Sequence, residues 1–509
     1  MKKIAAILLA CLLLSGCVWG GGVYVPTGDA LFQDATTLPP YLEDLNSEQV
    51  LTLTFDPTGT LNPYTDSDPA NRMVFSLLYQ GLFSVDMQYS VNPILCKQYS
   101  VSKDMQTYTF HLEYATFPDG TLVTAEDVVA SLEAARAGSV YSGRFTYIST
   151  ITAMEDGSVV IQLTTPYENL PILLDIPIVK ASAVASAWPV GTGAYHQQQS
   201  MSGPILVRRT DWWCRASMAA TAAGISLREI DSLTSLRDDF EFGRVGMVCA
   251  DPGTDTYVDF RCDYELWGCE SGVFLYLACN EKSQVFSNQK VRAALTYGID
   301  RSLLVSDFYG GFAMAASLPA SPNWPYYNNK LADQYDYDLE TFQRLVSEAS
   351  PAKMDITLLV NSADSRRIRV ARKIAEMLTA GGFKVTVNAL NGTSYTTALS
   401  KGNYDLHLGQ TKLSANMDLS PFFAPKGSLN FGSLSDAGLY ALCQEALAND
   451  GNYYTLYQKV MQDGMLCPIL FRSYAIYTQR GLISNLNPAR DNVFWYTLGK
   501  TMEDCRVSE

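Results

Sequence analysis

The chain has 509 residues, a formal net charge of −15 at neutral pH and 17% charged residues, against about 25% in an average protein. This acidity argues against a nucleic-acid partner, because counterion release from phosphates requires clustered Lys and Arg. The length suggests two or three domains with sizeable cores.

The first seventeen residues have the organisation of an export signal. Lys2 and Lys3 supply positive charge, residues 4–14 form an apolar run, and small residues precede Cys17. The run is too short to cross a bilayer as a helix, which needs about 20 apolar residues. The pattern resembles the lipobox of bacterial lipoproteins, which implies cleavage after residue 16 and a diacylglycerol on the sulfur of Cys17. An ordinary secretory signal with a chance cysteine is the alternative, and both interpretations place the remaining chain outside the cytoplasm.

Residues 17–49 have the composition of a tether, with a Gly-Gly-Gly run, paired prolines and no sustained periodicity before about Val50. A flexible segment of this length spans roughly 30 Å. No second apolar stretch of about 18 residues occurs in the chain. The lipid on Cys17 is therefore the expected attachment to the bilayer, with a folded body just above it.

Apart from Cys11 in the signal and Cys17, the chain has nine cysteines, so at least one must be unpaired within the chain. No Cys-x-x-Cys pair occurs, which argues against a metal site. Most of these cysteines are interpreted as small buried hydrophobic residues. An oxidising compartment would permit a disulfide between Cys262 and Cys269, and a reducing one would leave both as thiols.

The chain after the tether alternates strands and helices. In the first half, residues 108–113 and 158–164 have strand patterns, and Thr124 with Asp127 opens a helix that ends at Gly138. The later half has a strand at 355–360, a helix at 365–380 and a strand at 383–389, an order typical of a parallel crossover in an α/β lobe. Further elements are expected at residues 393–400, 404–408, 435–448, 453–465 and 469–477.

Residue types and motifs that are common in catalytic sites are scarce in this sequence. His111, His196 and His407 are the only histidines, and no common nucleophile, zinc or phosphate-loop motif occurs. The acidic group at residues 238–241 is interpreted as a solvated face. We therefore expect a binding protein with no catalytic residues, no metal site and no cofactor.

Seven segments occur in the order known from family 5 extracellular solute-binding proteins, the peptide-binding components of ABC importers, and the chain resembles this family over most of its mature length. The family's usual Glu is replaced by Gln80, and a common Pro by Ala194. The segments are Asn62-Pro-Tyr64 with Tyr79-Gln-Gly-Leu-Phe83, Tyr108-Thr-Phe-His-Leu-Glu113, Phe117-Pro-Asp-Gly-Thr121 with Leu122-Val-Thr-Ala-Glu-Asp-Val-Val129, Pro189-Val-Gly-Thr-Gly-Ala-Tyr195, Asn280 with Val291-Arg-Ala-Ala-Leu295 and Gly298-Ile-Asp-Arg301, Ser400-Lys-Gly-Asn-Tyr-Asp-Leu406, and Ser420-Pro-Phe-Phe423.

The resemblance implies an α/β fold with the two-lobed, type II architecture of periplasmic binding proteins and a strand-rich insertion in the first lobe. The lobes would close on a ligand about a hinge. The implied division is a signal peptide at 1–16, an anchor and tether at 17–49, a first lobe at 50–82, 188–271 and 478–509, an inserted subdomain at 83–187, and a second lobe at 272–477.

One departure concerns the ligand's amino group. Peptide-binding members carry an Asp shortly before the Phe-Phe loop, and this position is Ala415 here. The amine of a peptide would then lose a charge-assisted hydrogen bond worth about 1.5 to 3 kcal/mol. Either Asn416 or Asp418 takes this role in a shifted loop, or the ligand is not a conventional short peptide.

The resemblance and the aromatic residues in predicted loops nominate a small set of cleft residues. Trp267 and Trp324 are expected in loops, where they could form the wall of a pocket, although core packing is the other interpretation for each aromatic side chain. The candidate ligand-binding residues are Asn62, Tyr64, Thr192, Tyr195, Trp267, Trp324, Asn416 and Asp418.

The resulting hypothesis is a monomeric, lipid-anchored receptor that captures a small solute, a peptide in the first instance, for an ABC permease in the membrane. A receptor for chelated nickel, haem or a glycoside is the nearest alternative. A signalling receptor that senses a peptide without transport, and a secreted hydrolase, are the alternatives from other classes.

Overall fold

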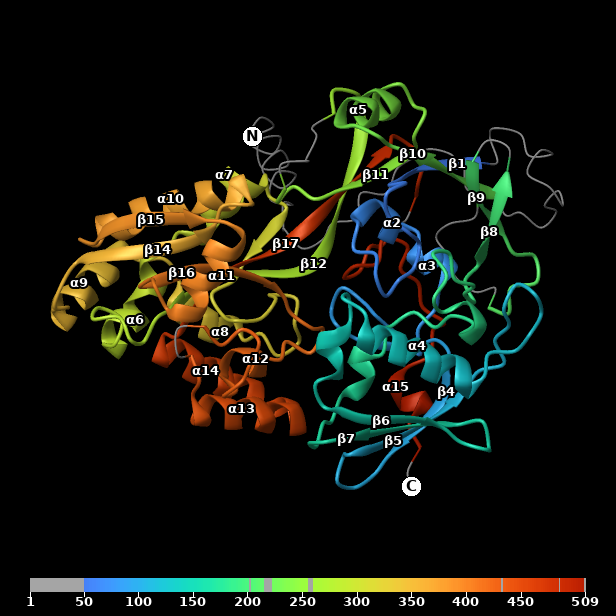
Figure 1. The fold of residues 1–509 in the computed structure, drawn as a ribbon, viewed down its shortest axis with the longest axis horizontal. Helices are drawn as coiled ribbons and strands as arrows, with labels where there is room; N and C mark the ends of the chain where they lie inside the picture. Colours follow the sequence, from blue (N-terminus) through green and yellow to red (C-terminus); the bar gives the residue numbers. More distant parts are fainter. Residues whose placement is uncertain are drawn as a thin grey trace, which may run out of the picture.

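One mixed sheet runs through the whole body of the molecule and joins its two halves (Figure 1). The computed structural model describes residues 50–200, 203–214, 222–254, 260–431, 434–484 and 486–507, so the lipobox and the tether lie outside it. Within the described residues the sheet has eleven strands. Along the sheet the order is β15 (Lys384–Leu390), β14 (Asp355–Asn361), β16 (Leu406–Lys412), β12 (Tyr264–Cys279), β17 (Leu466–Gln479), β11 (Met247–Ala250), β1 (Val50–Phe55), β10 (Gly224–Glu229), β9 (Gly203–Arg208) and β8 (Tyr195–Ser200), with β13 (Ala313–Ala315) beside β17.

The long antiparallel strands β12 and β17 connect the halves. Their pairing is interrupted by a bulge between Glu270 and Phe274, and Gly272 in this bulge has a φ of 69°. On one side of the bulge β17 also pairs with β11, and on the other side β12 pairs with β16. A bulge bends a strand and increases its twist. The two halves of the sheet therefore meet at an angle set by this bulge.

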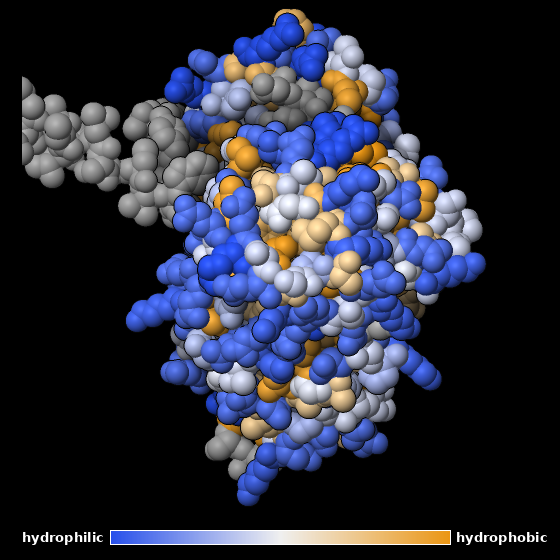
Figure 2. Space-filling model, turned by 90° about the vertical axis from the view of Figure 1, so that its left-hand side faces the viewer, coloured by the Kyte–Doolittle hydropathy of each residue, from blue (hydrophilic) through white to orange (hydrophobic). Residues whose placement is uncertain are grey.

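The half that contains β14, β15 and β16 is an α/β lobe, as the sequence predicts. Asp364 caps the helix α10 (Ser365–Ala380), and Gly381 and Gly382 follow its end. Strands β14 and β15, which flank this helix in sequence, pair in parallel, and β14 also pairs in parallel with β16. The predicted strands and helices of this region are confirmed to within a few residues. Figure 2, which faces this end of the molecule, shows a largely hydrophilic surface with small separate apolar areas.

A second, smaller sheet forms a separate layer beside the first lobe. Its order is β4 (Cys96–Val101), β5 (Thr107–Leu112), β7 (Val159–Leu163) and β6 (Ile148–Ala153), and a hairpin of β2 (Phe83–Val85) and β3 (Val91–Pro93) precedes it. Helix α4 (Ala125–Ala137) begins at the predicted capping box, in which Thr124 and Asp127 bond each other's backbone N–H groups. The rings of Tyr108 and Phe110 on β5 are fully buried against this layer.

The carboxyl-terminal segment returns to this smaller sheet. The short helix α15 (Met502–Cys505) lies beside β4, and Tyr99 forms a bridge with Arg506 (Figure 1). The remaining helices are α2 (Pro69–Met73), α3 (Phe75–Leu78), η3 (Ser142–Phe145), η4 (Leu170–Leu173), η5 (Ala181–Ala183), α5 (Leu233–Glu241), α6 (Gln289–Ala294), η6 (Leu295–Gly298), α7 (Arg301–Tyr309), α8 (Asn329–Ala332), η7 (Asp333–Tyr335), α9 (Leu339–Ala349), α11 (Gly392–Lys401), α12 (Ser420–Phe423), α13 (Ala437–Ala448), η8 (Asp450–Asn452) and α14 (Tyr453–Asp463).

The structure corrects two sequence-based expectations about side chains. The nine described cysteines are all free thiols. A disulfide between Cys262 and Cys269 does not form, because Cys269 lies five residues into the extended strand β12, roughly 16 Å beyond the first residue of that strand. Asp239 is buried rather than solvated and forms ion pairs with Arg228 and Arg244. Among the described residues, no helix combines the length and apolar character that a membrane span requires.

Candidate ligand-binding cleft

A cavity of about 490 Å³ lies where the two lobes face each other beside the β12–β17 connection. Its wall combines α2, the segment after α4, the end of β16 and the carboxyl-terminal segment. More than 300 residues separate α2 from β16 in the sequence, so this cavity brings together distant segments of the chain. Six of the residues that line it are Arg72, Tyr141, Arg144, Lys412, Arg490 and Asp491.

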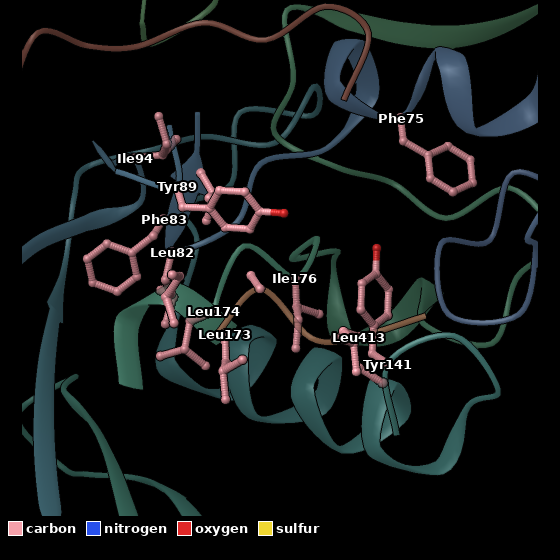
Figure 3. Packing of buried hydrophobic residues seen from close by; sticks show 14 of the residues in the cluster. Phe75, Leu82, Phe83, Tyr89, Ile94, Tyr141, Leu173, Leu174, Ile176 and Leu413 are labelled. Carbon is pink, nitrogen blue, oxygen red and sulfur yellow. The ribbon is translucent and has the colours of Figure 1, made fainter. Parts of the chain in front are cut away.

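A smaller cavity of about 80 Å³ adjoins the cleft and shares five of these six residues, all except Lys412. Figure 3 shows its apolar surroundings, with Phe75 and Tyr141 on one side and Phe83 and Ile94 on the other. Ser76 and Ser84 also line this cavity, and their hydroxyl oxygens are buried without a hydrogen-bond partner among the described residues. The inner cavity is therefore a pocket with both apolar and charged walls, which also contain hydrogen-bonding groups that are not in use.

The charged side chains of the two cavities comprise four cations and two carboxylates. Arg144 forms an ion pair with Asp175, and Lys412 forms one with Asp491. The Arg490 guanidinium donates to the backbone carbonyl of Leu413 and lies over the ring of Tyr89. With both carboxylates paired, the cavity walls carry a surplus of two positive charges.

Within the described part of the chain, Arg72, like Arg490, has no carboxylate in an ion pair. Its guanidinium donates to the backbone carbonyl of Asp66 at 3.3 Å and to the Tyr141 hydroxyl at 3.5 Å. It also lies 5.3 Å from the ring centroid of Phe75. Among the described residues, no carboxylate oxygen lies within ion-pairing distance of it. These neutral contacts hold the guanidinium in place without neutralising its charge.

The cleft changes the titration of its own ion pair. Loss of bulk water lowers the pKa of Lys412 to about 8, and the nearby Arg72 and Arg490 act in the same direction against Asp491. Burial alone would raise the pKa of Asp491, but Lys412 and the two guanidinium groups lower it. Lys412 is thus a cation near neutral pH and the group in the cleft whose charge is easiest to remove.

The predicted residues Asn62 and Tyr64 hold the first lobe together. The Asn62 amide donates to the carbonyls of Val184 at 3.0 Å and Ser186 at 2.8 Å, and the buried Tyr64 hydroxyl donates to the carbonyl of Pro177 at 2.9 Å. Neither residue lines the inter-lobe cavity or its inner pocket.

The Gly-Thr-Gly segment packs closely against helix α3. A Cβ atom on Gly193 would overlap the backbone carbonyl of Leu77, so this motif permits close approach of two chain segments. Thr192 is fully buried, and the Tyr195 hydroxyl donates to the carbonyl of Ala222 at 2.7 Å. Tyr195 lines a separate cavity of about 120 Å³ on the far side of α3.

The two predicted pocket tryptophans have different positions. Trp267 lies inside strand β12 and not in a loop, because buried and exposed side chains alternate through its segment. Its indole N–H donates to the Thr478 hydroxyl at 3.2 Å. Trp324 lies in a loop as predicted, but it is buried between the rings of Tyr89 and Tyr453. Neither lines the inter-lobe cavity.

Asn416 and Asp418 lie where the inserted subdomain meets the second lobe. The Asp418 carboxylate accepts hydrogen bonds from the Ser420 backbone N–H at 2.8 Å and from the Tyr147 hydroxyl at 3.3 Å. Burial raises its pKa. The Asn416 carbonyl accepts from the Tyr453 hydroxyl at 2.8 Å. The eight candidate residues thus lie at several separate places in the fold, and none of them lines the cavity between the lobes or its inner pocket.

The sequence did not indicate Arg72, Lys412, Arg490 or Asp491 as cleft residues. The one available signal was the sparse charge of the carboxyl-terminal segment, since Arg490 and Asp491 are the only charged residues between Gly481 and Leu498. Within the described residues, no group of three or more His, Cys, Asp or Glu side chains could hold a metal ion.

Known proteins resemble this chain in sequence and in fold. The glutathione-binding protein GsiB of Escherichia coli K12 is 26% identical over 433 residues, which cover 79% of this chain and 84% of the relative. The oligopeptide-binding protein AppA of Bacillus subtilis, solved with a nonapeptide, superposes with a TM-score of 0.59 at 19% identity, covering 89% of this chain and 98% of AppA. NikA of Brucella suis, solved with Fe(III)-EDTA, gives a TM-score of 0.67 at 18% identity, covering 84% and 95%.

The fold agrees with these neighbours, which were solved with different bound compounds. The sequence pattern of the bacterial extracellular solute-binding proteins, family 5 middle section, matches residues 90–430. This match covers more than half of the chain and includes the inserted subdomain and most of the second lobe. The chain therefore belongs to the family 5 bacterial extracellular solute-binding proteins.

Proposed function

We propose that the protein is a lipid-anchored receptor that captures a small peptide-like solute between its lobes and delivers it to an ABC permease. Its family makes it the solute-binding component of an ABC importer and not an enzyme. The proposal adds the ligand class, the anchor and the mode of capture.

The observation that carries the proposal is the cavity between the lobes, because it is lined by residues from both. Arg72 and Tyr141 come from the amino-terminal half, and Lys412 from the end of β16. A ligand in this position would contact both lobes at once, so it would favour the closed arrangement over an open one.

Several features support a peptide-like ligand. The cavity wall combines the aromatic rings of Tyr141 and Tyr474 with the hydroxyl groups of Thr411 and Ser414. Such a wall can contact apolar side chains and also hydrogen-bond to peptide groups. The E. coli relative is named for glutathione, which is a tripeptide.

The proposed lobes are residues 50–82, 188–271 and 478–509 for the first, 272–477 for the second and 83–187 for the insertion. The bulge at Gly272 supports a hinge at the boundary between residues 271 and 272. It separates the part of β12 that pairs with β17 alone from the part that also pairs with β16. Single-molecule distance measurements between labels on α4 and α13 test this division. Ligand should shorten that distance, and an unchanged distance on saturation would contradict closure.

Mass spectrometry of ligand retained by the purified protein, followed by calorimetry with the compound found, tests the ligand class. A bound peptide supports the proposal. Recovery of a haem, a chelated metal or a glycoside, together with no thermal stabilisation by a broad peptide library, would replace the peptide by that compound.

The anchor is tested separately with Cys17→Ala. This variant should leave the membrane fraction, while Cys11→Ala, which changes a cysteine inside the signal, should remain in it. Retention of Cys17→Ala that requires detergent for release would contradict the lipid anchor.

A further inference from the structure

We propose that the ligand carries a carboxylate and that Arg72, assisted by Lys412, binds it; this inference rests on the proposed function and specifies its ligand. The proposal begins from charge. Four cations and two carboxylates line the cleft and its inner pocket, and both carboxylates already have cationic partners. A neutral ligand would leave the surplus charge without a counterion.

Arg72 is the group best placed to receive the carboxylate. It lines both the cleft and the inner pocket, so a ligand in either space can reach it. Its contacts with Asp66, Tyr141 and Phe75 involve a carbonyl, a hydroxyl and an aromatic ring, none of which is charged. A guanidinium oriented in this way offers paired N–H donors to a planar carboxylate.

The groups around Arg72 suit the same ligand group. Ser76 and Ser84 line the inner pocket with hydroxyl oxygens that have no partner among the described residues, and a hydroxyl can donate to a carboxylate oxygen. Lys412 lies on the opposite lobe, where its ammonium pairs with Asp491 while its side chain stays 38% exposed. A ligand carboxylate can therefore contact a cation from each lobe.

The acids near the site do not offset this preference. Asp175 is held by Arg144, and Glu270 accepts the Tyr89 hydroxyl and, at 3.3 Å, the Asn323 amide. Ala415 is fully buried and does not line the cleft. Among the described residues that line the cleft and its inner pocket, both carboxylates are ion-paired, and the charged groups without an ion pair are the cations Arg72 and Arg490.

Calorimetry on the full-length protein with matched probes tests the proposal. The probes are Ala-Glu-Ala and its neutral isostere Ala-Gln-Ala, each as the free acid and as the carboxyl-terminal amide, together with glutarate and glutaramide. The acid-bearing member of at least one matched pair should bind about tenfold more tightly than its neutral partner. This preference should weaken when salt is raised, as for any charge-based contact.

Variants identify the residue. Arg72→Gln should abolish the preference for the acid-bearing probe and leave affinity for the neutral isostere within about twofold of the wild type. Arg72→Lys should restore part of the preference for the acid. Arg344→Gln is the matched control, because Arg344 is an exposed arginine on α9 with 58% of its side chain accessible. It removes the same charge outside the cleft and should change neither affinity.

The outcomes separate this inference from the proposed function. If peptides bind but acid and neutral members bind equally, the peptide function stands and the carboxylate inference fails. If glutarate binds through Arg72 and no peptide does, the inference stands and the peptide function fails. Equal losses for acid and neutral probes in Arg72→Gln would assign Arg72 a structural role and overturn the inference, as would the absence of an acid preference in every pair.

Discussion

The Lys412 ammonium at the end of strand β16 forms an ion pair with the carboxylate of Asp491 in the carboxyl-terminal segment. Both residues line the cavity, and the pair joins two segments that are far apart in the chain. Burial and the nearby Arg72 and Arg490 lower the pKa of Lys412 to about 8 from the usual value near 10.5, although Asp491 acts against them. The charge that would help to bind an acidic ligand can therefore be removed within a mild pH range.

Binding of an acidic ligand should weaken as the pH rises through about 8. Below this value Lys412 is protonated and attracts a carboxylate, and above it the side chain becomes neutral. We expect the dissociation constant of Ala-Glu-Ala to rise about fivefold between pH 7 and pH 9.5, measured by calorimetry. Lys412→Arg keeps its charge throughout and should lose this dependence. An equal pH dependence in both proteins would contradict the assignment to Lys412.

Gly272→Ala should destabilise the protein and also weaken ligand binding. Gly272 has a φ of 69°, and a Cβ atom there would overlap the guanidinium of Arg490, which bonds to the carbonyl of Leu413. We expect a loss of about 1 to 3 kcal/mol in the free energy of unfolding. Denaturant unfolding and calorimetry measure the two effects.

Gly120→Ala is the control for Gly272→Ala. Gly120 has a φ of 80°, and no atom lies within 4 Å of the position of an added Cβ. It should show the cost of backbone strain without any effect on ligand affinity. If Gly272→Ala binds ligand as well as Gly120→Ala does, the position of Arg490 is not important for binding.

Asp418→Asn should stabilise the protein or leave it unchanged at pH 7. Burial raises the pKa of Asp418, so the folded state holds its proton more tightly than the unfolded state does. Stability therefore falls as pH rises above the unfolded pKa, and a neutral amide avoids that loss while it can still accept from Ser420 and Tyr147. Any gain in melting temperature should disappear near pH 3, where both states are protonated.

The same variant tests whether Asp418 binds a ligand amine. Its position between the inserted subdomain and the second lobe predicts peptide affinity within about twofold of the wild type. A tenfold loss of affinity for a peptide, with no loss for its amino-acetylated form, would return Asp418 to the binding site.

Gly193→Ala should prevent or severely weaken folding. The added methyl group would overlap the Leu77 carbonyl, which belongs to the backbone and cannot move as a side chain can. We expect a cost of about 3 kcal/mol, seen as a lower denaturant midpoint. Gly143→Ala, where nothing lies within 4 Å of the added atom, should have a small effect. Normal stability of Gly193→Ala would contradict the packing role of the Gly-Thr-Gly motif.

The sequence predicts the elements of this fold better than it predicts the cleft, for physical reasons. The helix 365–380 is bounded by a capping Asp364 and by Gly381, and the capping box of Thr124 and Asp127 is local, so each can be found in a short segment. Trp267 was misplaced because strand β12 continues through a segment whose burial comes from distant neighbours.

The cleft depends on contacts between residues far apart in the chain. Arg72, Lys412 and Asp491 come together through the tertiary fold, in which β12 and β17 pair along the middle of the sheet, and no local pattern marks any of them. Family motifs did not help, because Asn62 and Gly193 maintain the scaffold of the first lobe. The recurrent segments therefore identify the family, and the residues that line the cavity lie outside them.

The position of Arg490 and Asp491 near the end of the chain has a consequence for synthesis and export. A ribosome makes these residues after all the described strands and after every described helix except α15. A chain that stops or is cut before them would lack the counterion of Lys412 and the contact to Leu413. A chain shortened in this way would retain every strand of the large sheet but lose two of the charged residues that line the cavity.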